Sequence, residues 1–259
     1  MFAFPAKAQD TDAEASVPAP ASVSTAGNAG GFRRLWAGVA GSFELVFLGQ
    51  GNDVCKLTPD AKPVGPLGAY CTNPGGSDFP SRATPAQNDS LLPGRAGELD
   101  GGVKVGDVRV LVAADYAVTA SLLAGMRIGY VLNDYPGDTG VSGRVAPLRH
   151  VHLEARGTYL FGPDPLTRVA FAPMVFAGAG FAPMDGHTLT QVSAAGVRGH
   201  TAINAWQIGG PGYLVAGGGV RYGFSPRAGF TMAWKGSLGF GGASTLFATG
   251  PEVGFQYGF

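Results

Sequence analysis

Apolar and polar residues alternate along most of the chain, from Phe32 to the C-terminus. The pattern is most regular in 249–259, where every second residue is apolar: Val253, Phe255, Tyr257 and Phe259. A period of two predicts a β-strand with one apolar and one polar face. Soluble proteins seldom expose such a row of aromatic side chains, so we expect a second sheet or lipid to cover that face.

The same alternation recurs upstream, and it predicts about eight strands. Their expected ranges are 35–48, 105–116, 120–132, 148–161, 168–181, 213–224, 230–240 and 249–259. The range 168–181 is the least regular, because both of its faces are apolar. Pro173 within it lacks a backbone N–H, so we expect a bulge or a local break in pairing there.

The connections between these strands alternate between long and short. The ranges 49–102 and 182–211 are rich in turn-forming residues, and we expect both to be long irregular loops. An even number of strands with this rhythm is typical of a transmembrane barrel, with short periplasmic turns and long extracellular loops. The predicted fold class is therefore all-β: a closed antiparallel up-and-down transmembrane β-barrel over 32–259. The alternative is a soluble β-sandwich with the aromatic residues in its core.

The hydrocarbon core of a membrane requires the sheet to close. Hydrocarbon offers no partner for backbone N–H and C=O groups, and a closed sheet leaves no unpaired edge. A barrel of about eight strands has a lumen that side chains fill, so we expect no wide aqueous pore. The charges on the inward faces then need partners, and we predict a salt-bridged lumen network. Its expected members are Glu44, Arg109, Arg127, Glu154, Arg156, Lys235 and Glu252. It would form either a structural plug, which we favour, or an ion path.

The last strand resembles the C-terminal signature of bacterial outer-membrane proteins, which closes on Phe with aromatic residues two and four positions earlier. In that family the barrel-insertion machinery recognises this strand, so the resemblance implies an assembly signal at Phe255, Tyr257 and Phe259. The overall strand pattern resembles the small eight-stranded outer-membrane barrels of the OmpA/OmpX-like group. This resemblance implies a bacterial outer-membrane location with both termini in the periplasm.

Composition agrees with a membrane barrel. Charged residues are 14% of the chain, against roughly 25% in soluble domains. Basic and acidic residues balance at 18 each, so no charged field suggests nucleic acid as a partner. The longest apolar run, 169–184, is too short for a membrane helix and contains two prolines. The 43 glycines suit tightly curved strands around a narrow lumen.

The N-terminal range 1–31 differs from the rest. Ala6 and Ala8 have the small-residue spacing of a signal-peptide cleavage site, so we expect a signal-peptide remnant there. Residues 9–31 are rich in Ala, Ser, Pro and Thr, and we expect a flexible periplasmic tail.

Cys55 and Cys71 are the two cysteines of the chain, and both lie in a polar stretch rich in Gly and Pro. No histidine or third cysteine nearby completes a zinc site. We therefore expect a disulfide formed in an oxidising compartment, rather than two free thiols.

Catalytic chemistry has only weak candidates. His150 and His152 point to opposite faces of one strand, so they cannot form one site. His187 and His200 share a loop with Asp185 and Ser193 at no recognised spacing. The glycines of 217–219 and of 178–180 lie outside any strand–loop–helix unit, so we expect them to pack in curved strands and not to bind phosphate. We expect no catalytic residue, no cofactor and no metal site.

Two groups of aromatic residues remain. We expect an interfacial girdle near the strand ends, formed by Trp36, Tyr116, Tyr130, Tyr159, Tyr222 and Tyr257. Ile203, Trp206 and Ile208 form an apolar cluster in the second long loop, where they would pack over the barrel mouth or contact a partner.

The functional hypothesis is an outer-membrane barrel with a structural or binding role, exercised through its extracellular loops or within an envelope complex. The expected partners are outer-membrane lipid, the barrel-assembly machinery and a periplasmic or extracellular protein. The alternatives are a narrow porin-like channel for ions or small solutes, and a lipid- or peptide-modifying enzyme with its site at the rim.

Overall fold

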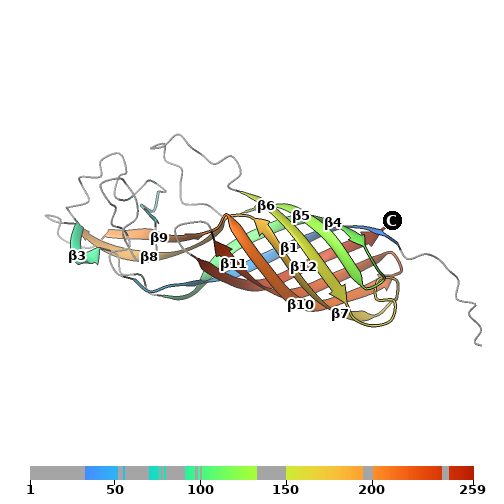
Figure 1. The fold of residues 1–259 in the computed structure, drawn as a ribbon. Coiled ribbons are helices and arrows are strands. Elements are labelled where there is room, and N and C mark those ends of the chain that lie inside the picture. Colours follow the sequence, from blue (N-terminus) through green and yellow to red (C-terminus); the bar gives the residue numbers. More distant parts are fainter. Residues whose placement is uncertain are drawn as a thin grey trace, which may run out of the picture. The chain divides into compact units, whose positions relative to one another are not determined.

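The computed structural model describes residues 33–51, 55, 70–75, 77, 79, 91–96, 99, 101–132, 150–194, 201–240 and 245–259. Eight strands close into an antiparallel barrel (Figure 1). They are β1 (Leu35–Leu48), β4 (Gly102–Ala117), β5 (Leu122–Val131), β6 (Val151–Leu160), β7 (Phe171–Phe181), β10 (Gly212–Ser225), β11 (Ala228–Phe240) and β12 (Leu246–Gly258). The order around the barrel is β1-β12-β11-β10-β7-β6-β5-β4, and β1 pairs with both β4 and β12. The predicted all-β closed barrel is confirmed.

The two faces of the barrel wall carry opposite chemistry. Outward apolar side chains are open to the surroundings, as at Met126, which is 64% exposed, and Phe171, which is 71% exposed. Inward positions hold buried charges, such as Glu44 and Arg109, each 1% exposed. This arrangement is the reverse of a water-soluble core and excludes the β-sandwich alternative, in which the aromatic residues would pack against one another inside.

No helix within the described residues is long and apolar enough to cross a membrane.

A β-bulge interrupts β4 near its start. The β1–β4 register shifts between the pairs Phe43–Val108 and Leu45–Val105. Gly106 and Asp107 are consequently both buried, although they are neighbours in sequence. A Cβ atom on Gly106 would lie 2.6 Å from Val46 Cγ1, so glycine permits this close approach.

Pro173 lies in β7 without a bulge, so that part of the prediction was wrong, whereas the pairing of β7 with β6 does end beside it, at Met174. The β7–β10 ladder runs through it in continuous register, with Pro173 opposite Val220. On the other side, the Pro173 carbonyl accepts a hydrogen bond of 2.9 Å from the N–H of Phe161, one residue beyond β6. The missing N–H therefore falls where the β6–β7 ladder ends, and no bond in the middle of the sheet is lost.

A second sheet stands where sequence analysis expected two irregular loops. Its order is β2-β9-β8-β3, and its strands are β2 (Tyr70–Thr72), β3 (Leu91–Ala96), β8 (Met184–Ala194) and β9 (Thr201–Gly209). β8 and β9 form a hairpin, while β2 and β3 come from the first long connection and pair with its outer edges. The expectation of an irregular 182–211 was therefore wrong. We call these four strands the outer sheet.

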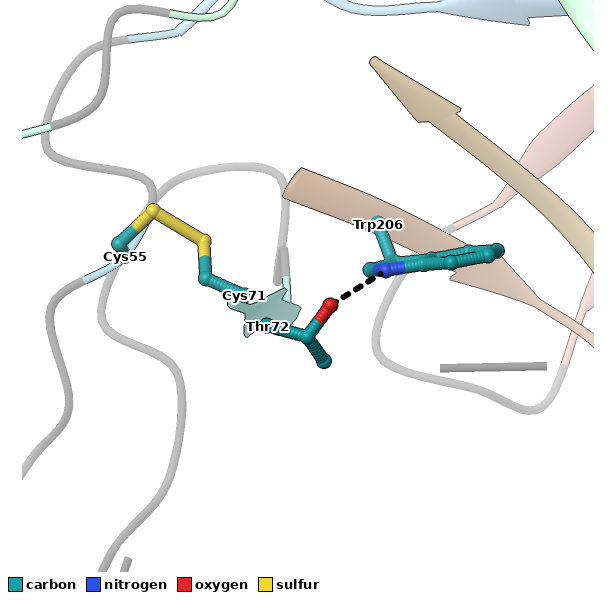
Figure 2. Close-up of a disulfide and its surroundings, with 4 residues drawn as sticks. All are labelled: Cys55, Cys71, Thr72 and Trp206. Carbon is teal, nitrogen blue, oxygen red and sulfur yellow. Dashed lines mark hydrogen bonds between the residues drawn. A yellow bond between two sulfur atoms is a disulfide. The ribbon is translucent and has the colours of Figure 1, made fainter. Parts of the chain in front are cut away.

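A disulfide joins Cys55 to Cys71, as predicted (Figure 2). Cys71 lies in β2, and both cysteines are buried. Beside them, Trp206 of β9 donates a hydrogen bond of 3.1 Å from Nε1 to Thr72 Oγ1 (Figure 2). Ile203 and Trp206 are thus buried parts of the outer sheet, and Ile208 lies in the same strand.

The aromatic girdle differs from its prediction at one position. The predicted tyrosines are exposed on the outward face: Tyr116, Tyr130, Tyr159, Tyr222 and Tyr257. Trp36 lies inside the barrel instead, 2% exposed, with its ring 5.1 Å from the Arg221 guanidinium. The prediction for Trp36 was wrong because, in β1, alternation sends this position inward with the polar side chains.

Several sequence predictions lie outside the described residues. These are the signal-peptide remnant and tail of 1–31, most of the connection 49–102, and His200.

Glycines inside the barrel wall allow close packing, as the sequence suggested. A Cβ atom on Gly217 would lie 2.5 Å from the Phe176 ring. On Gly180 it would lie 2.2 Å from the Leu153 carbonyl oxygen and 2.6 Å from the Tyr213 hydroxyl. Contacts this short require neighbouring atoms to move, so a side chain at these positions strains the wall.

We predict that Gly180→Ala destabilises the barrel by about 1–3 kcal/mol, since the added methyl group overlaps backbone on β6 and the Tyr213 ring. Urea unfolding in detergent micelles, followed by electrophoretic mobility without boiling, measures the loss. Gly157→Ala is the matched control, because a Cβ atom there meets nothing within 4 Å. Equal stability of the two variants would contradict this account of the wall.

Candidate functional site

Charged side chains from many barrel strands meet in the lumen. All of the predicted members lie there and are buried: Glu44, Arg109, Arg127, Glu154, Arg156, Lys235 and Glu252. Each occupies an inward position of its strand because the alternation of β1, β4, β5, β6, β11 and β12 places it there. We call this group, with Asp107, His152 and Tyr213, the lumen network.

One half of the network centres on Glu44. Lys235 Nζ lies 3.0 Å from Glu44 Oε1, and Arg109 Nη2 lies 2.9 Å from Glu44 Oε2. Arg109 also donates to Asp107 Oδ2 and to the Pro183 carbonyl, both at 2.9 Å. The carboxylate of Glu44 on β1 is therefore shared between Arg109 of β4 and Lys235 of β11, which lie on opposite sides of β1 in the barrel order.

The other half centres on Arg156. Its guanidinium forms a fork with Glu252, through hydrogen bonds of 2.6 and 3.0 Å, and its Nε donates to Glu154. Arg127 Nη1 lies 3.6 Å from the same Glu154. Lys235 joins the two halves, because its Nζ is also 3.9 Å from Glu252 Oε2. Two-point Arg–carboxylate pairs are the strongest of the common ion pairs.

His152 and Tyr213 form a second link between the halves. Arg109 Nη1 lies 3.1 Å from His152 Nδ1, and arginine can only donate, so Nδ1 accepts. The remaining ring nitrogen, Nε2, then carries the proton toward the Tyr213 hydroxyl at 2.9 Å. That hydroxyl donates to Glu154 Oε2 at 2.9 Å. The network thus fixes His152 as a neutral imidazole with its proton on Nε2.

Sequence analysis missed part of this network. It treated His152 only as a weak catalytic candidate, and it did not consider Tyr213 at all. The usable signal for Tyr213 was Gly180 beside it, because a large inward side chain fits only where its neighbour is small.

Charge balance makes this burial tolerable. The cations Arg109, Arg127, Arg156 and Lys235 contact the carboxylates of Glu44, Asp107, Glu154 and Glu252. Each charge has a counter-charge in reach, which offsets the large desolvation cost of burial.

Apolar side chains lie beyond the network at both ends of the lumen. Toward the outer sheet these are Val46, Leu48, Met184 and Leu246, and toward the short turns they are Leu123, Leu160, Leu166 and the Trp36 ring. The cavity bordered by Leu123, Arg127 and Gln256 measures about 10 Å³, room for about one water molecule. Buried side chains thus occupy both ends and the middle of the lumen among the described residues.

The described histidines lie in separate surroundings. His150 stacks on Tyr130, and His187 stacks on Trp206 in the outer sheet. His152 Nε2 is 3.5 Å from Glu154 Oε2, and the imidazole is fully buried inside the network. Among the residues that the structure describes, no group of three or more His, Cys, Asp or Glu is placed to hold a metal ion.

The sequence matches no known family model, and no curated protein is significantly similar to it. Solved structures with a remote likeness to the chain include the following three proteins. Neisserial surface protein A (NspA) is 10% identical, with a TM-score of 0.41, over 87% of this chain and 97% of that chain. The N-terminal β-barrel domain of Pseudomonas aeruginosa OprF is 11% identical, with a TM-score of 0.34, over 85% and 97%. Ail of Yersinia pestis, solved with a heparin analogue, is 8% identical, with a TM-score of 0.26, over 86% and 99%. Scores this low describe a remote likeness, and they assign neither a function nor a partner to this chain.

We predict that Arg156→Gln lowers the free energy of unfolding by about 3–5 kcal/mol, because two buried carboxylates lose their main counter-charge. The double variant Arg156→Gln with Glu252→Gln should lose less than the sum of the single variants, since each removes the same interaction. Urea titration in micelles measures the free energy of unfolding of all three proteins.

Arg168→Gln is the control for this series. Arg168 is exposed in the connection between β6 and β7, so its loss should change stability by no more than about 0.5 kcal/mol. An additive double variant would rule out energetic coupling between Arg156 and Glu252.

Proposed function

We propose that the chain is a bacterial outer-membrane β-barrel with a side-chain-filled lumen, acting in envelope structure or in binding through its outer sheet. The observation that carries the proposal is the inverted distribution of side chains: an apolar wall facing outward around a paired charge network. In water such a wall would be an interaction or aggregation site far larger than monomeric soluble proteins expose. The apolar outward wall is suited to a hydrocarbon environment.

Strand length supports a membrane span. The shortest barrel strands, β5 and β6, have 10 residues, and the longest, β4, has 16. A tilted strand needs about 9–11 residues to cross the hydrocarbon core.

Aromatic side chains support the same placement. Near the short turns they form contacting pairs on the outward face, Phe171 with Tyr222 and Tyr257 with Phe259. Near the outer sheet, Phe47 packs on Phe247. Aromatic side chains at both ends of an apolar wall are expected at the two membrane interfaces.

The proposed orientation places the outer sheet outside the cell. Residues 33 and 259 both lie at the end with the short turns, where Gly258 N–H donates to the Arg227 carbonyl in the β10–β11 turn. Short turns face the periplasm in such barrels, so both termini are proposed to be periplasmic. The outward aromatic row Phe255, Tyr257 and Phe259 is proposed to serve as the barrel-assembly signal.

Binding by the outer sheet is better supported than transport through the lumen. The outer sheet is a paired structure, braced by the Cys55–Cys71 disulfide and the Trp206–Thr72 hydrogen bond. Binding surfaces are commonly carried by segments that a rigid scaffold holds in place.

We predict that the purified protein, inserted in planar lipid bilayers, gives no steady ionic conductance, because paired charges and apolar layers occupy the lumen. Heat-modifiable migration on gels verifies that the same sample is a folded membrane barrel. A sample that shifts on heating and also conducts steadily would favour the narrow-channel alternative. A sample without heat modification would argue against the membrane barrel itself.

We also predict that a photo-crosslinking residue in place of Leu189 captures a discrete protein or envelope component in intact cells. Leu189 on β8 is 69% exposed, unusually so for an apolar residue of the outer sheet. The matched control carries the crosslinker in place of Met126, which is similarly exposed but lies on the barrel wall and should capture lipid. Identical products at both positions would count against a binding role for the outer sheet.

A further inference from the structure

A pocket lies between the barrel wall and the outer sheet. Its volume is about 260 Å³, and its lining comes from the β4 bulge, β8 and β9: Val105, Gly106, Asp107, Asp185, His187, Asn204 and Trp206. Val105 and His187 are exposed residues, so the pocket is reached from the surface. We call it the mouth pocket.

Asp185 is the unusual member of this pocket. Its side chain is 6% exposed, and its Oδ1 has no hydrogen-bond partner within the part of the chain that the structure describes. The other carboxylate of the pocket, Asp107, is already satisfied by Arg109 at 2.9 Å and also accepts from the Asp185 N–H at 3.4 Å. A buried acceptor without a donor is costly, so a ligand that donates a hydrogen bond to Asp185 would be favoured.

The charge count points to the sign of that partner. Within the lumen network the cations and carboxylates balance, and Asp185 stands outside that balance. The attraction of Arg109 reaches Asp185, but Arg109 is engaged by Glu44 and Asp107. Burial and the neighbouring Asp107 charge raise the pKa of Asp185 above its usual range. A cation in the pocket would favour the carboxylate.

The walls of the pocket suit an organic cation. Trp206 and His187 stack on each other with ring centroids 4.3 Å apart, and both line the pocket. Tryptophan is the aromatic side chain that attracts cations most strongly. Asn204 adds an amide that can accept a further hydrogen bond.

Size limits the ligand. Pockets for drug-sized molecules span roughly 300–1,000 Å³, and the mouth pocket is slightly smaller. A short alkyl chain with one charged head group is of this size.

We propose that the mouth pocket binds a protonated amine or guanidinium group, with Asp185 as its counter-charge and Trp206 as its aromatic wall. A neutral polyol of the same size could accept and donate hydrogen bonds there, but it would leave the carboxylate without a counter-charge. The group belongs to a free small molecule or to a lysine or arginine side chain of a bound peptide, since the two present the same chemistry.

The test uses the full chain, folded in detergent micelles, and saturation-transfer NMR with titration. The probes are n-butylammonium, 1-butanol and butyrate, which share one alkyl chain and differ in head-group charge. Butylammonium should bind saturably, and the neutral and anionic probes should bind at least tenfold more weakly. Binding of 1-butanol as tight as that of butylammonium, or no saturable binding of butylammonium, would overturn the proposal.

Variants locate the binding. Asp185→Asn keeps the size of the side chain and should weaken butylammonium at least tenfold, while heat-modifiable migration verifies that the barrel is folded. Asp115→Asn is the matched control, because Asp115 is also buried with an unpartnered Oδ2 among the described residues but does not line the pocket. Undiminished binding by folded Asp185→Asn would refute the assignment.

A last arm distinguishes the two sources of the cation. A short acetylated peptide with one lysine is compared with butylammonium at equal concentration. Tighter binding of the peptide would identify a protein side chain as the natural occupant, and tighter binding of butylammonium would identify a free amine. Both results support the pocket as a cation site.

Discussion

The charged side chains of the lumen network are stabilised by one another. Their surroundings are a narrow lumen and an apolar wall, so each carboxylate of the lumen network depends on a neighbouring cation, which for Glu44 and Glu252 comes from another strand. Glu44 of β1 holds Arg109 of β4 and Lys235 of β11, and Arg156 of β6 holds Glu252 of β12. These pairs connect strands across the lumen as well as neighbours in the wall. The strands of the wall therefore place the charges, and the charge pairs in turn connect the strands.

Much of the barrel could be predicted from alternation, because a period of two decides both that a strand forms and which side chains point inward. The network members followed from that phase together with the cost of an unpaired buried charge. Local sequence could not show which charges meet, since Arg156 and Glu252 are 96 residues apart. It also could not reveal the β4 bulge, which depends on how Gly106 packs against Val46.

The outer sheet was missed for a different reason. β2 has 3 residues, too few to display a period, and its partner β9 is more than 100 residues away in sequence. The strand-like composition around Thr190 and Trp206 was present, but turn-forming residues on both sides outweighed it. Short strands that exist only through a distant partner carry almost no local signal. For the same reason the mouth pocket, assembled from β4, β8 and β9, is invisible in any one stretch of sequence.

The seam between β1 and β12 has a consequence for how the chain acquires its structure. Trp36 pairs with Gly258, and the ladder continues to Phe47 and Phe247, so the contact that closes the cylinder joins the two most distant strands in sequence. Hairpins such as β10–β11 can form from neighbouring residues, but the seam cannot form until β12 has been synthesised. Such long-range pairing makes folding slow and leaves two open edges in the meantime. An unclosed chain would therefore need a protected path between the ribosome and the membrane.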